Sequence, residues 1–354
     1  VSGNCRLSYA DLDEASNKVA NALSKIGVTK GDRVAMLLPN SPEFVAVYFG
    51  IVKTGGIAVP LSIRYKVAEL ASLFENSQPK ILVSESSYLE PLVPTLPEFK
   101  YIQQVIDLSP KGRDQFLDYG EIMSTSSAQK VEVKLEPEDA ALVAYTSGPT
   151  VYPKGVVLTH HSLAKEAIIS GNGFQQTDKD TVLLFALPMY HMFGLVSIFL
   201  TAIHKGSTVV MVPGLSISNL MAAIEYEKGT IFMGVPYIYA LTVNMAEKEG
   251  IENDLSSLRL CCSAGAPLPI DVVKQFKRHF GLDIIDFWGL TEAVCQITCS
   301  SPDGTGKLGS VGKVLPDWEI KIVDDNGKEQ APNQPGEIIA RGPIMKGFYN
   351  NPQA

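Results

Sequence analysis

The sequence has few cysteines and no cluster of positive charge, and each shortage excludes a class of protein. Its 354 residues include five cysteines, a small and odd number that is typical of reduced thiols and not of a disulfide framework. The formal net charge of −8 argues against a nucleic-acid partner, because no basic stripe is present to neutralise phosphates. No apolar run approaches the roughly 20 residues that cross a bilayer, so we expect a cytoplasmic protein without a transmembrane segment.

Two catalytic signatures and one metal signature are missing as well. No Gly-x-Ser-x-Gly stretch indicates a serine-hydrolase elbow, and no Gly-Lys-Ser/Thr run opens a helix as in a Walker loop. Cys295 and Cys299 lie four residues apart and Cys261 is adjacent to Cys262, a spacing without the paired Cys-x-x-Cys geometry of zinc sites. Core thiols are therefore the favoured interpretation of these cysteines, with a zinc site as the alternative.

Helical and strand patterns alternate through most of the chain. Ser8 and Asp11 begin a helix with a capping-box pattern, and apolar residues then recur at helical spacing until Gly27. Short apolar runs such as RVAMLL, GGIAVPL, ALVAYTSG and LRLCCSAG alternate with further helical stretches. This alternation predicts an open, doubly wound α/β fold with largely parallel strands, in which ligands bind beyond the carboxyl ends of the strands.

The C-terminal part has a different pattern. Alternating strand residues on either side of Asp325-Asn326-Gly327 predict an antiparallel hairpin, because this tripeptide is a strong turn signal. We therefore expect a small antiparallel, barrel-like part after the α/β region.

The stretch TSGPTVYPKG, at 146–155, has the composition of a phosphate-binding loop with two of its parts exchanged. Its hydroxyls and Lys154 suit the oxygen atoms of a nucleotide. Pro149, however, has no N–H to donate, and Val151 resists a left-handed backbone. Taken alone, the stretch is equally consistent with an ordinary turn rich in Gly, Pro and Ser.

Three further stretches follow apolar strands and suit nucleotide chemistry. PMYHMFG places His191 beside a strand end, either as a structural histidine or as part of an apolar substrate pocket. SAGAPLP, at 263–269, is either a tight strand-to-helix connection or a turn whose small side chains let a flat ring approach. DFWGLTEA offers Trp288 for stacking, and its Thr291 and Glu292 suit a phosphate with Mg²⁺, unless they simply start a helix.

These four stretches, in this order, resemble the adenylate-forming (AMP-binding) superfamily, and within it fatty-acyl-CoA and 4-coumarate-CoA ligases most closely. TSGPTVYPKG matches the family loop except at Pro149 and Val151, and WGLTE matches the aromatic-Gly-x-Thr-Glu signature. The resemblance runs from LSYADLDEASNKVANAL to the last residue. It implies the family's large N-terminal domain, an α/β fold layered α-β-α-β-α with two mostly parallel sheets and a small antiparallel barrel-like part. The implied subdomains are 1–185, 186–305 and 306–354, the last being the start of the barrel-like part.

Site residues can be transferred from the family motif by motif. The resemblance implies that Lys154 holds the departing phosphates, that Thr291 contacts the α-phosphate and that Glu292 holds Mg²⁺. His191 and Gly289 would border the acyl pocket, and His191 would serve catalysis together with Thr291 and Glu292. The nucleotide-binding residues implied are Thr146, Ser147, Gly148, Thr150, Lys154, Gly265, Ala266, Pro267, Asp286, Phe287, Trp288 and Gly289.

The implied reaction converts a carboxylic acid, fatty or aryl-propenoic, and ATP into acyl-AMP, and then forms a thioester with CoA. Its partners would be the acid, ATP with Mg²⁺, and CoA as co-substrate. Two alternatives stay open. The enzyme could load a carrier-protein thiol instead of CoA, or the chain could be a non-catalytic homologue that binds a nucleotide or an acyl group.

Two departures from the family pattern bear on activity. The family's Thr-Gly-Asp segment and its smaller C-terminal lid domain lie beyond GFYNNP, so we expect this piece to form acyl-adenylate slowly or not at all. Pro149 removes a donor to a charged group, worth about 1.5–3 kcal/mol. Strain at Val151 would add about 1–3 kcal/mol. We therefore expect slower adenylation, which Pro149→Thr combined with Val151→Gly should accelerate.

Overall fold

The computed structural model describes residues 1–109, 114–145, 154–351 and 353, which are divided between two units. The first unit comprises Val1–His161, Pro188–His191 and Met345–Ala354. The second comprises Ser162–Leu187 and Met192–Ile344. No helix in the described part of the chain is long and apolar enough to cross a membrane.

The first unit is built on an eight-stranded mixed sheet. Its strands are β1 (Arg33–Leu37), β2 (Ile57–Pro60), β3 (Ile81–Ser84), β4 (Gln104–Asp107), β5 (Leu117–Asp118), β6 (Ala140–Tyr145), β7 (Gly155–Thr159) and β17 (Gly347–Phe348). They lie in the order β17-β7-β6-β2-β1-β3-β4-β5. Among these described strands, the pairs β17–β7 and β7–β6 are antiparallel and the other pairs are parallel. The predicted mostly parallel sheet is therefore confirmed here.

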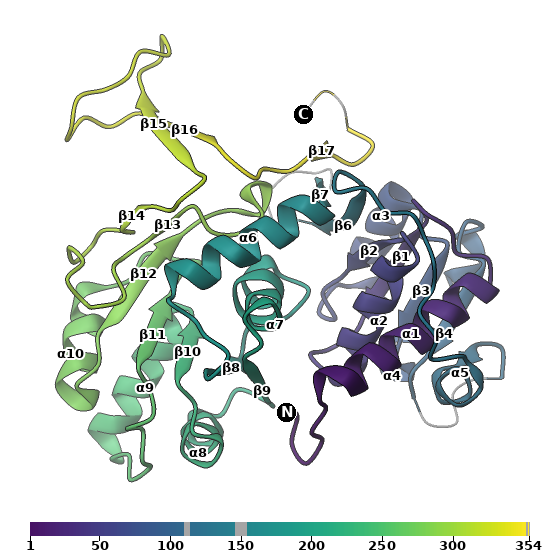
Figure 1. Ribbon diagram of the computed structural model, residues 1–354, viewed down its shortest axis with the longest axis horizontal. Helices are drawn as coiled ribbons and strands as arrows, with labels where there is room; N and C mark the ends of the chain where they lie inside the picture. The colour runs from purple at the N-terminus through teal and green to yellow at the C-terminus, as the bar shows by residue number, and fades with distance from the viewer. Residues whose placement is uncertain (110–113, 146–153, 352, 354) are drawn as a thin grey trace. The chain divides into compact units, whose positions relative to one another are not determined.

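The helices of the first unit begin where the sequence supplies caps. They are α1 (Tyr9–Lys25), α2 (Pro42–Lys53), α3 (Val67–Ser77), α4 (Ser86–Leu89), the 3-10 helix η1 (Leu96–Glu98) and α5 (Tyr119–Thr125). The backbone N–H of Ser8 donates to Asp11 Oδ2 at 2.8 Å, and Ser8 Oγ accepts from the N–H of Asp11, which confirms the predicted capping box. Helices α1 and α2 pack side by side, and a Cβ atom on Gly50 would overlap Val19 (Figure 1).

The second unit is built on a seven-stranded mixed sheet. Its strands are β8 (Thr181–Phe185), β9 (Thr208–Val212), β10 (Ile231–Gly234), β11 (Leu260–Ser263), β12 (Ile284–Trp288), β13 (Thr298–Cys299) and β14 (Lys313–Val314). They lie in the order β14-β13-β12-β11-β10-β8-β9, and β13 runs antiparallel to both of its neighbours. The five strands from β12 to β9 are parallel, so the prediction of a second mostly parallel sheet is also confirmed.

The helices of the second unit follow or precede the parallel strands, as expected for crossover connections. They are α6 (His160–Gly173), which begins at the end of the first unit, the π-helix η2 (Phe193–Leu200), α7 (Thr201–Lys205), α8 (Ile217–Glu227), α9 (Pro236–Lys248), α10 (Ile270–Phe280) and the 3-10 helix η3 (Thr291–Ala293). Helices α9 and α10 lie side by side (Figure 1).

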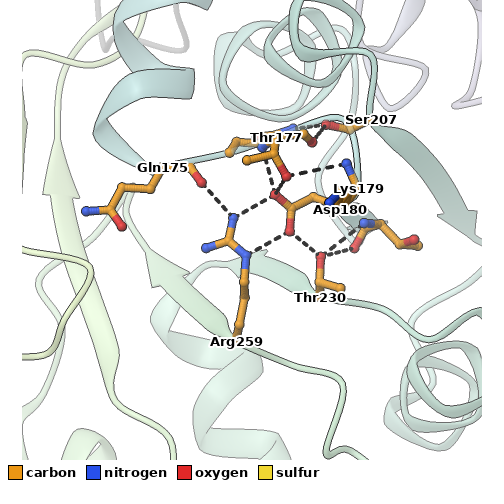
Figure 2. A network of polar contacts seen from close by, with 9 residues as sticks. Gln175, Thr177, Lys179, Asp180, Ser207, Thr230 and Arg259 are labelled. Atoms are coloured by element: carbon orange, nitrogen blue, oxygen red, sulfur yellow. Dashed lines mark hydrogen bonds and ion pairs between the residues drawn. The ribbon is translucent and has the colours of Figure 1, made fainter.

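A polar network joins the starts of three parallel strands of the second unit (Figure 2). Asp180 precedes β8, Thr230 precedes β10 and Arg259 precedes β11. Asp180 Oδ1 accepts hydrogen bonds from Thr230 Oγ1 at 2.7 Å and from Arg259 Nε at 2.8 Å. Burial alone would raise the pKa of Asp180, but these donors and the guanidinium charge outweigh it and lower the pKa to about 2. The network fixes strand register at the end of the sheet opposite the carboxyl ends.

The C-terminal part does not form a closed barrel among the described residues. Strand β14 joins the second sheet and β17 joins the first, while β15 (Glu319–Val323) and β16 (Glu337–Arg341) pair as a separate antiparallel ribbon. The ribbon extends away from the seven-stranded sheet (Figure 1). The predicted turn at Asp325-Asn326-Gly327 forms, with the N–H of Gly327 donating to Asp324 O. The antiparallel pairing predicted across this turn also forms, because β15 pairs with β16, and the N–H of Gln330 donates to Ile322 O at 2.8 Å between them.

Candidate functional site

The candidate site of the second unit lies at the carboxyl ends of β10, β11 and β12. These strands pair in register, with Gly234 opposite Ser263 and Ser263 opposite Asp286. Because parallel strands end at the same edge of a sheet, the turns that follow them are neighbours. The predicted stretches SAGAPLP and DFWGLTEA therefore meet at this edge.

The turn after β11 presents its backbone to solvent. Gly265 has φ +83°, a left-handed conformation that favours glycine, and the side chain of Val235 is its nearest neighbour. Gly265, Ala266 and Pro267 are all exposed. Ser263 is fully buried, and its Oγ has no hydrogen-bond partner among the described residues. The turn thus offers an open surface of small side chains above an unpaired hydroxyl.

Strand β12 presents Asp286 and Trp288 on one face and Phe287 on the other, because side chains alternate along a strand. The ring of Phe287 is buried, with its centroid 5.4 Å from that of Phe174 and 5.0 Å from that of Phe193. Burial raises the pKa of Asp286 to about 6, although the N–H of Phe287 opposes the rise. Asp286 is therefore largely ionised at neutral pH and can accept a hydrogen bond.

The loop after β12 is tightly constrained. A Cβ atom on Gly289 would overlap the carbonyl oxygen of Cys295, so only glycine fits there. Thr291 and Glu292 lie in η3 and are half-buried. Val294 then has φ 62° and ψ −51°, and the N–H of Cys295 donates to Ala293 O at 2.6 Å. This γ-turn with positive φ is strained for a β-branched residue, and such strain is concentrated at functional sites.

Two predicted site residues belong to the first unit. Lys154 is half-buried just before β7, and its Nζ lies 5.2 Å from the centroid of the Phe348 ring. The N–H of Tyr349 donates to Gly155 O at 2.6 Å, so the segment around β17 runs beside this lysine. His191 is exposed, and the protein around its ring still lowers its pKa through desolvation. His191 is therefore neutral at pH 7.

The predicted residues thus fall into three groups. The second unit brings together Gly265, Ala266, Pro267, Asp286, Phe287, Trp288, Gly289, Thr291 and Glu292. Lys154 and His191 belong to the first unit. Thr146, Ser147, Gly148 and Thr150, like Pro149 and Val151, lie outside the described residues.

The sequence analysis missed polar residues buried behind the loop that follows β12. Glu166 and Gln296 are each fully buried and joined by a hydrogen bond, the N–H of Gln296 donating to Glu166 Oε1 at 2.9 Å. One signal was available: Glu166 lies on the same face of its helix as Leu163, Ala167 and Ser170, all of which are buried. A glutamate on a buried helix face is rare unless it is paired.

Comparison with known proteins identifies relatives along almost the whole chain. Residues 1–349 match the family described as AMP-binding enzyme. The chain is 31% identical to 4-coumarate-CoA ligase 1 of Narcissus pseudonarcissus, covering 99% of this chain and 65% of that protein. It is 29% identical to a long-chain-fatty-acid–CoA ligase of Bacillus subtilis, covering 98% of this chain and 67% of that protein. The chain thus spans about two thirds of the length of these curated relatives.

A solved structure shares the fold. The anthranilate CoA ligase AuaEII, in complex with anthranoyl-AMP, superposes with a TM-score of 0.93 at 27% identity. The match covers 99% of this chain and 68% of that chain. The α/β architecture with two mostly parallel sheets is therefore that of acyl-CoA synthetase N-terminal domains.

Proposed function

Because the chain belongs to the family of AMP-binding enzymes, we propose that the full-length protein activates a carboxylic acid with ATP and transfers the acyl group to CoA. A carboxylate oxygen attacks the α-phosphorus of ATP, the bond to the bridging oxygen breaks, and pyrophosphate leaves. The CoA thiol then attacks the acyl carbon, releasing AMP and a proton. Among acids, we favour fatty and aryl-propenoic ones, because relatives named for both kinds match the chain.

One observation carries this proposal: the exposed turn after β11 lies beside the face of β12 that bears Asp286 and Trp288. In our proposal the adenine lies between Ala266 and the ring of Trp288, because a flat ring needs small side chains on one side and stacking on the other. Its amino group donates to the Asp286 carboxylate. The buried ring of Phe287 packs against Phe174 and Phe193 on the opposite face, which anchors β12 in the core. Gly265 and Pro267 shape the turn.

The residues after β12 suit the phosphates. We assign Thr291 to the α-phosphate through its hydroxyl and Glu292 to Mg²⁺, since a half-buried carboxylate beside a hydroxyl is a donor set of hard oxygens. The metal would neutralise phosphate charge when bound. Lys154, with the hydroxyls of Thr146, Ser147 and Thr150 and the backbone of Gly148, would neutralise the leaving pyrophosphate, because phosphoryl transfer depends mainly on positioning and charge.

His191 and Gly289 would border the acid. The neutral imidazole of His191 leaves the acid's carboxylate free of a competing cation, and Gly289 lets the acid approach the backbone. We place the enzyme in the cytoplasm, since its five cysteines carry free thiols. A carrier-protein thiol in place of CoA is the second candidate, and a non-catalytic homologue is the third.

Exchange of labelled pyrophosphate into ATP, measured with the full-length protein over a panel of carboxylic acids, separates the candidates. Acid-dependent exchange with consumption of CoA supports the proposal. Exchange without use of CoA supports a carrier-protein acceptor, and no exchange with any acid supports a non-catalytic homologue. Glu292→Gln should lower the exchange rate roughly 100-fold or more. The matched control Glu249→Gln, on an exposed residue at the end of α9, should leave it unchanged.

A further inference from the structure

Lys154 is held by an aromatic ring and not by a carboxylate. The ammonium nitrogen of this half-buried lysine lies over the ring of Phe348, 5.2 Å from the ring centroid. The negative face of an aromatic ring attracts a cation within roughly 6 Å of its centroid. In the described part of the chain, no carboxylate forms an ion pair with Lys154. The ring is therefore the group that restrains this cation.

Other half-buried lysines of the first unit are paired with carboxylates. Lys53 Nζ lies 2.7 Å from Asp13 Oδ1, and Lys80 Nζ lies 2.8 Å from Asp32 Oδ2. A carboxylate neutralises the charge of the lysine and occupies its N–H donors. An aromatic face attracts the cation and leaves its charge uncompensated. Lys154 therefore keeps its charge and its donors for an anionic ligand, although its position is restrained.

The register of β17 on β7 brings the lysine and the ring together. Phe348 lies opposite Val156 in this antiparallel pair, and the N–H of Tyr349 donates to Gly155 O at 2.6 Å beside it. Lys154 precedes Val156 by two residues, so its side chain is on the same face and diagonal to Phe348. Diagonal neighbours are within reach of long and aromatic side chains. The contact thus follows from the pairing of the two strands.

The backbone around Phe348 is anchored on both sides of this residue. The N–H of Lys346 donates to a carbonyl oxygen of β7 at 2.8 Å, and Asn350 Nδ2 donates to Asn76 O at 3.0 Å. All these residues belong to the same unit as Lys154. A side chain that binds a ligand is positioned best when the groups that support it are themselves fixed. Phe348 meets this condition.

Resting on the proposed function, in which Lys154 neutralises the leaving pyrophosphate, we propose that Phe348 is a positioning residue for this step. Its ring holds the Lys154 ammonium by a cation–π contact that is kept when ATP is bound, and the ammonium donates to phosphate oxygens. The ring takes no part in the chemistry. It restricts the lysine before ATP binds, so less side-chain entropy is lost when the ammonium is fixed against the phosphates.

The next residue offers a matched control on the other face of β17. The ring centroid of Tyr349 lies 5.9 Å from the guanidinium carbon of Arg33. That guanidinium also donates to Ser77 O at 2.8 Å and to Gln78 O at 2.7 Å. Tyr349 therefore makes a similar contact with a cation that carbonyl oxygens already hold and that has no part in the proposed reaction.

The test replaces Phe348, in the full-length protein, with phenylalanine analogues that carry one, two or three ring fluorines. Fluorine withdraws electron density from the ring face and weakens its attraction for a cation, while the shape of the ring is nearly kept. We expect kcat/KM for ATP in pyrophosphate exchange to fall with each fluorine, by about threefold to tenfold in total. The Kd for ATP with Mg²⁺, measured by calorimetry without acid, should rise by the same factor. The thermal midpoint should stay unchanged.

A double-mutant cycle shows whether this effect passes through the lysine. In a Lys154→Met background the cation is absent, so the same fluorine series should leave the Kd for ATP unchanged. The series at position 349, with Tyr349→Phe as its reference, should also leave it unchanged. Phe348→Leu removes the aromatic face and should weaken ATP binding at least as much as three fluorines. Phe348→Tyr keeps the face and should bind ATP like the wild type.

The outcomes separate this inference from the proposed function. A graded Kd for ATP without pyrophosphate exchange for any acid would support the role of Phe348 and contradict the adenylation proposal. Exchange at equal rates throughout the series would support adenylation and contradict the role of Phe348. A fluorine effect that persists in Lys154→Met would overturn the proposal. Tighter ATP binding with added fluorine would do the same, because the ring would then compete with the phosphates for the ammonium.

Discussion

Gly289 occupies a position with no room for a side chain, since a Cβ there would overlap the carbonyl oxygen of Cys295. We expect Gly289→Ala to displace the loop after β12, lowering the free energy of unfolding by about 1–3 kcal/mol. A displacement of about 1 Å at Thr291 and Glu292 should slow pyrophosphate exchange roughly 100-fold. Chemical denaturation and the exchange assay measure the two effects.

The matched control for this substitution is Gly171→Ala in the last turn of α6. Its Cβ would meet only the flexible end of the Lys205 side chain, which can move. Alanine is favoured over glycine in a helix by up to about 1 kcal/mol, so the control should be neutral or slightly stabilising and fully active. Equal activity of Gly289→Ala and Gly171→Ala would show that the close contact behind Gly289 is irrelevant to the site.

Glu166 makes the stability of the fold depend on pH. Its folded pKa of about 8 lies above the usual value of 4.5 for an exposed carboxyl, mainly because of burial. The stabilising contribution of the protonated form is therefore complete below pH 4.5 and is lost as pH rises through 8. Between these values stability should fall by up to about 1.4 kcal/mol per pH unit from this group.

Denaturation of wild type and Glu166→Gln from pH 5 to 9 isolates this contribution, because glutamine does not titrate. We expect the difference in the free energy of unfolding to change steadily in favour of the variant as pH rises. Parallel pH profiles for the two proteins would mean that Glu166 is ionised or hydrated in the folded state.

At the scale of elements, the helices and strands that depend on residues close in sequence were predicted correctly. Ser8 and Asp11 cap α1 as the pattern indicated. Local signals suffice there because a cap and its partner lie within one helical turn. The apolar runs form strands as predicted, because the apolar pattern of a strand and the turn residues that flank it also lie close together in the sequence.

Pairings between distant residues could not be predicted from the pattern. The Asp325-Asn326-Gly327 turn and the antiparallel pairing of β15 with β16 on either side of it were predicted, but the start of β16 at Glu337 was not. Arg259 and Asp180 are separated by 79 residues, and no periodicity links them. The strained turn at Val294 was invisible as well, because valine is among the least expected residues at positive φ.

The network of Asp180, Thr230 and Arg259 predicts that two arginine–carboxylate pairs differ widely in their contribution to stability. Arg259→Met leaves Asp180, only 4% exposed, without its cation, so we expect a loss of about 3 kcal/mol of stability. The control Arg341→Met breaks a pair of similar geometry on the ribbon, where the arginine side chain is 80% exposed. We expect a loss below about 1 kcal/mol there. Chemical denaturation of both variants measures the difference.

Lowering the pH should remove the stability that Asp180 contributes through this network. The pKa of Asp180 is lowered to about 2, so the stability it contributes is present above its usual pKa of 3.8 and is lost as pH falls through 2. Wild type should therefore lose stability more steeply than Asp180→Asn in this acid range. Similar losses for Arg259→Met and Arg341→Met at neutral pH would contradict the role assigned to the network.

At the scale of the whole molecule, the order of motifs predicted the fold class correctly, because each motif follows a strand and parallel strands end at one edge. The predicted subdomain boundaries at 185 and 305 and the roles of the site residues stay predictions. The order of motifs could not show that residues 188–191 and 345–354 belong to the first unit. Both segments are separated in sequence from the main part of that unit, Val1–His161.

The central claim is that the turns after β11 and β12 hold adenylate. A crystal structure of the full-length protein with AMP bound tests it most directly. We expect adenine between Ala266 and Trp288, with its amino group within hydrogen-bonding distance of the Asp286 carboxylate and the phosphate beside Thr291. AMP bound elsewhere, for example in the cavity of about 490 Å³ lined by Ile251, Leu258 and Phe280, with both turns empty, would contradict the account.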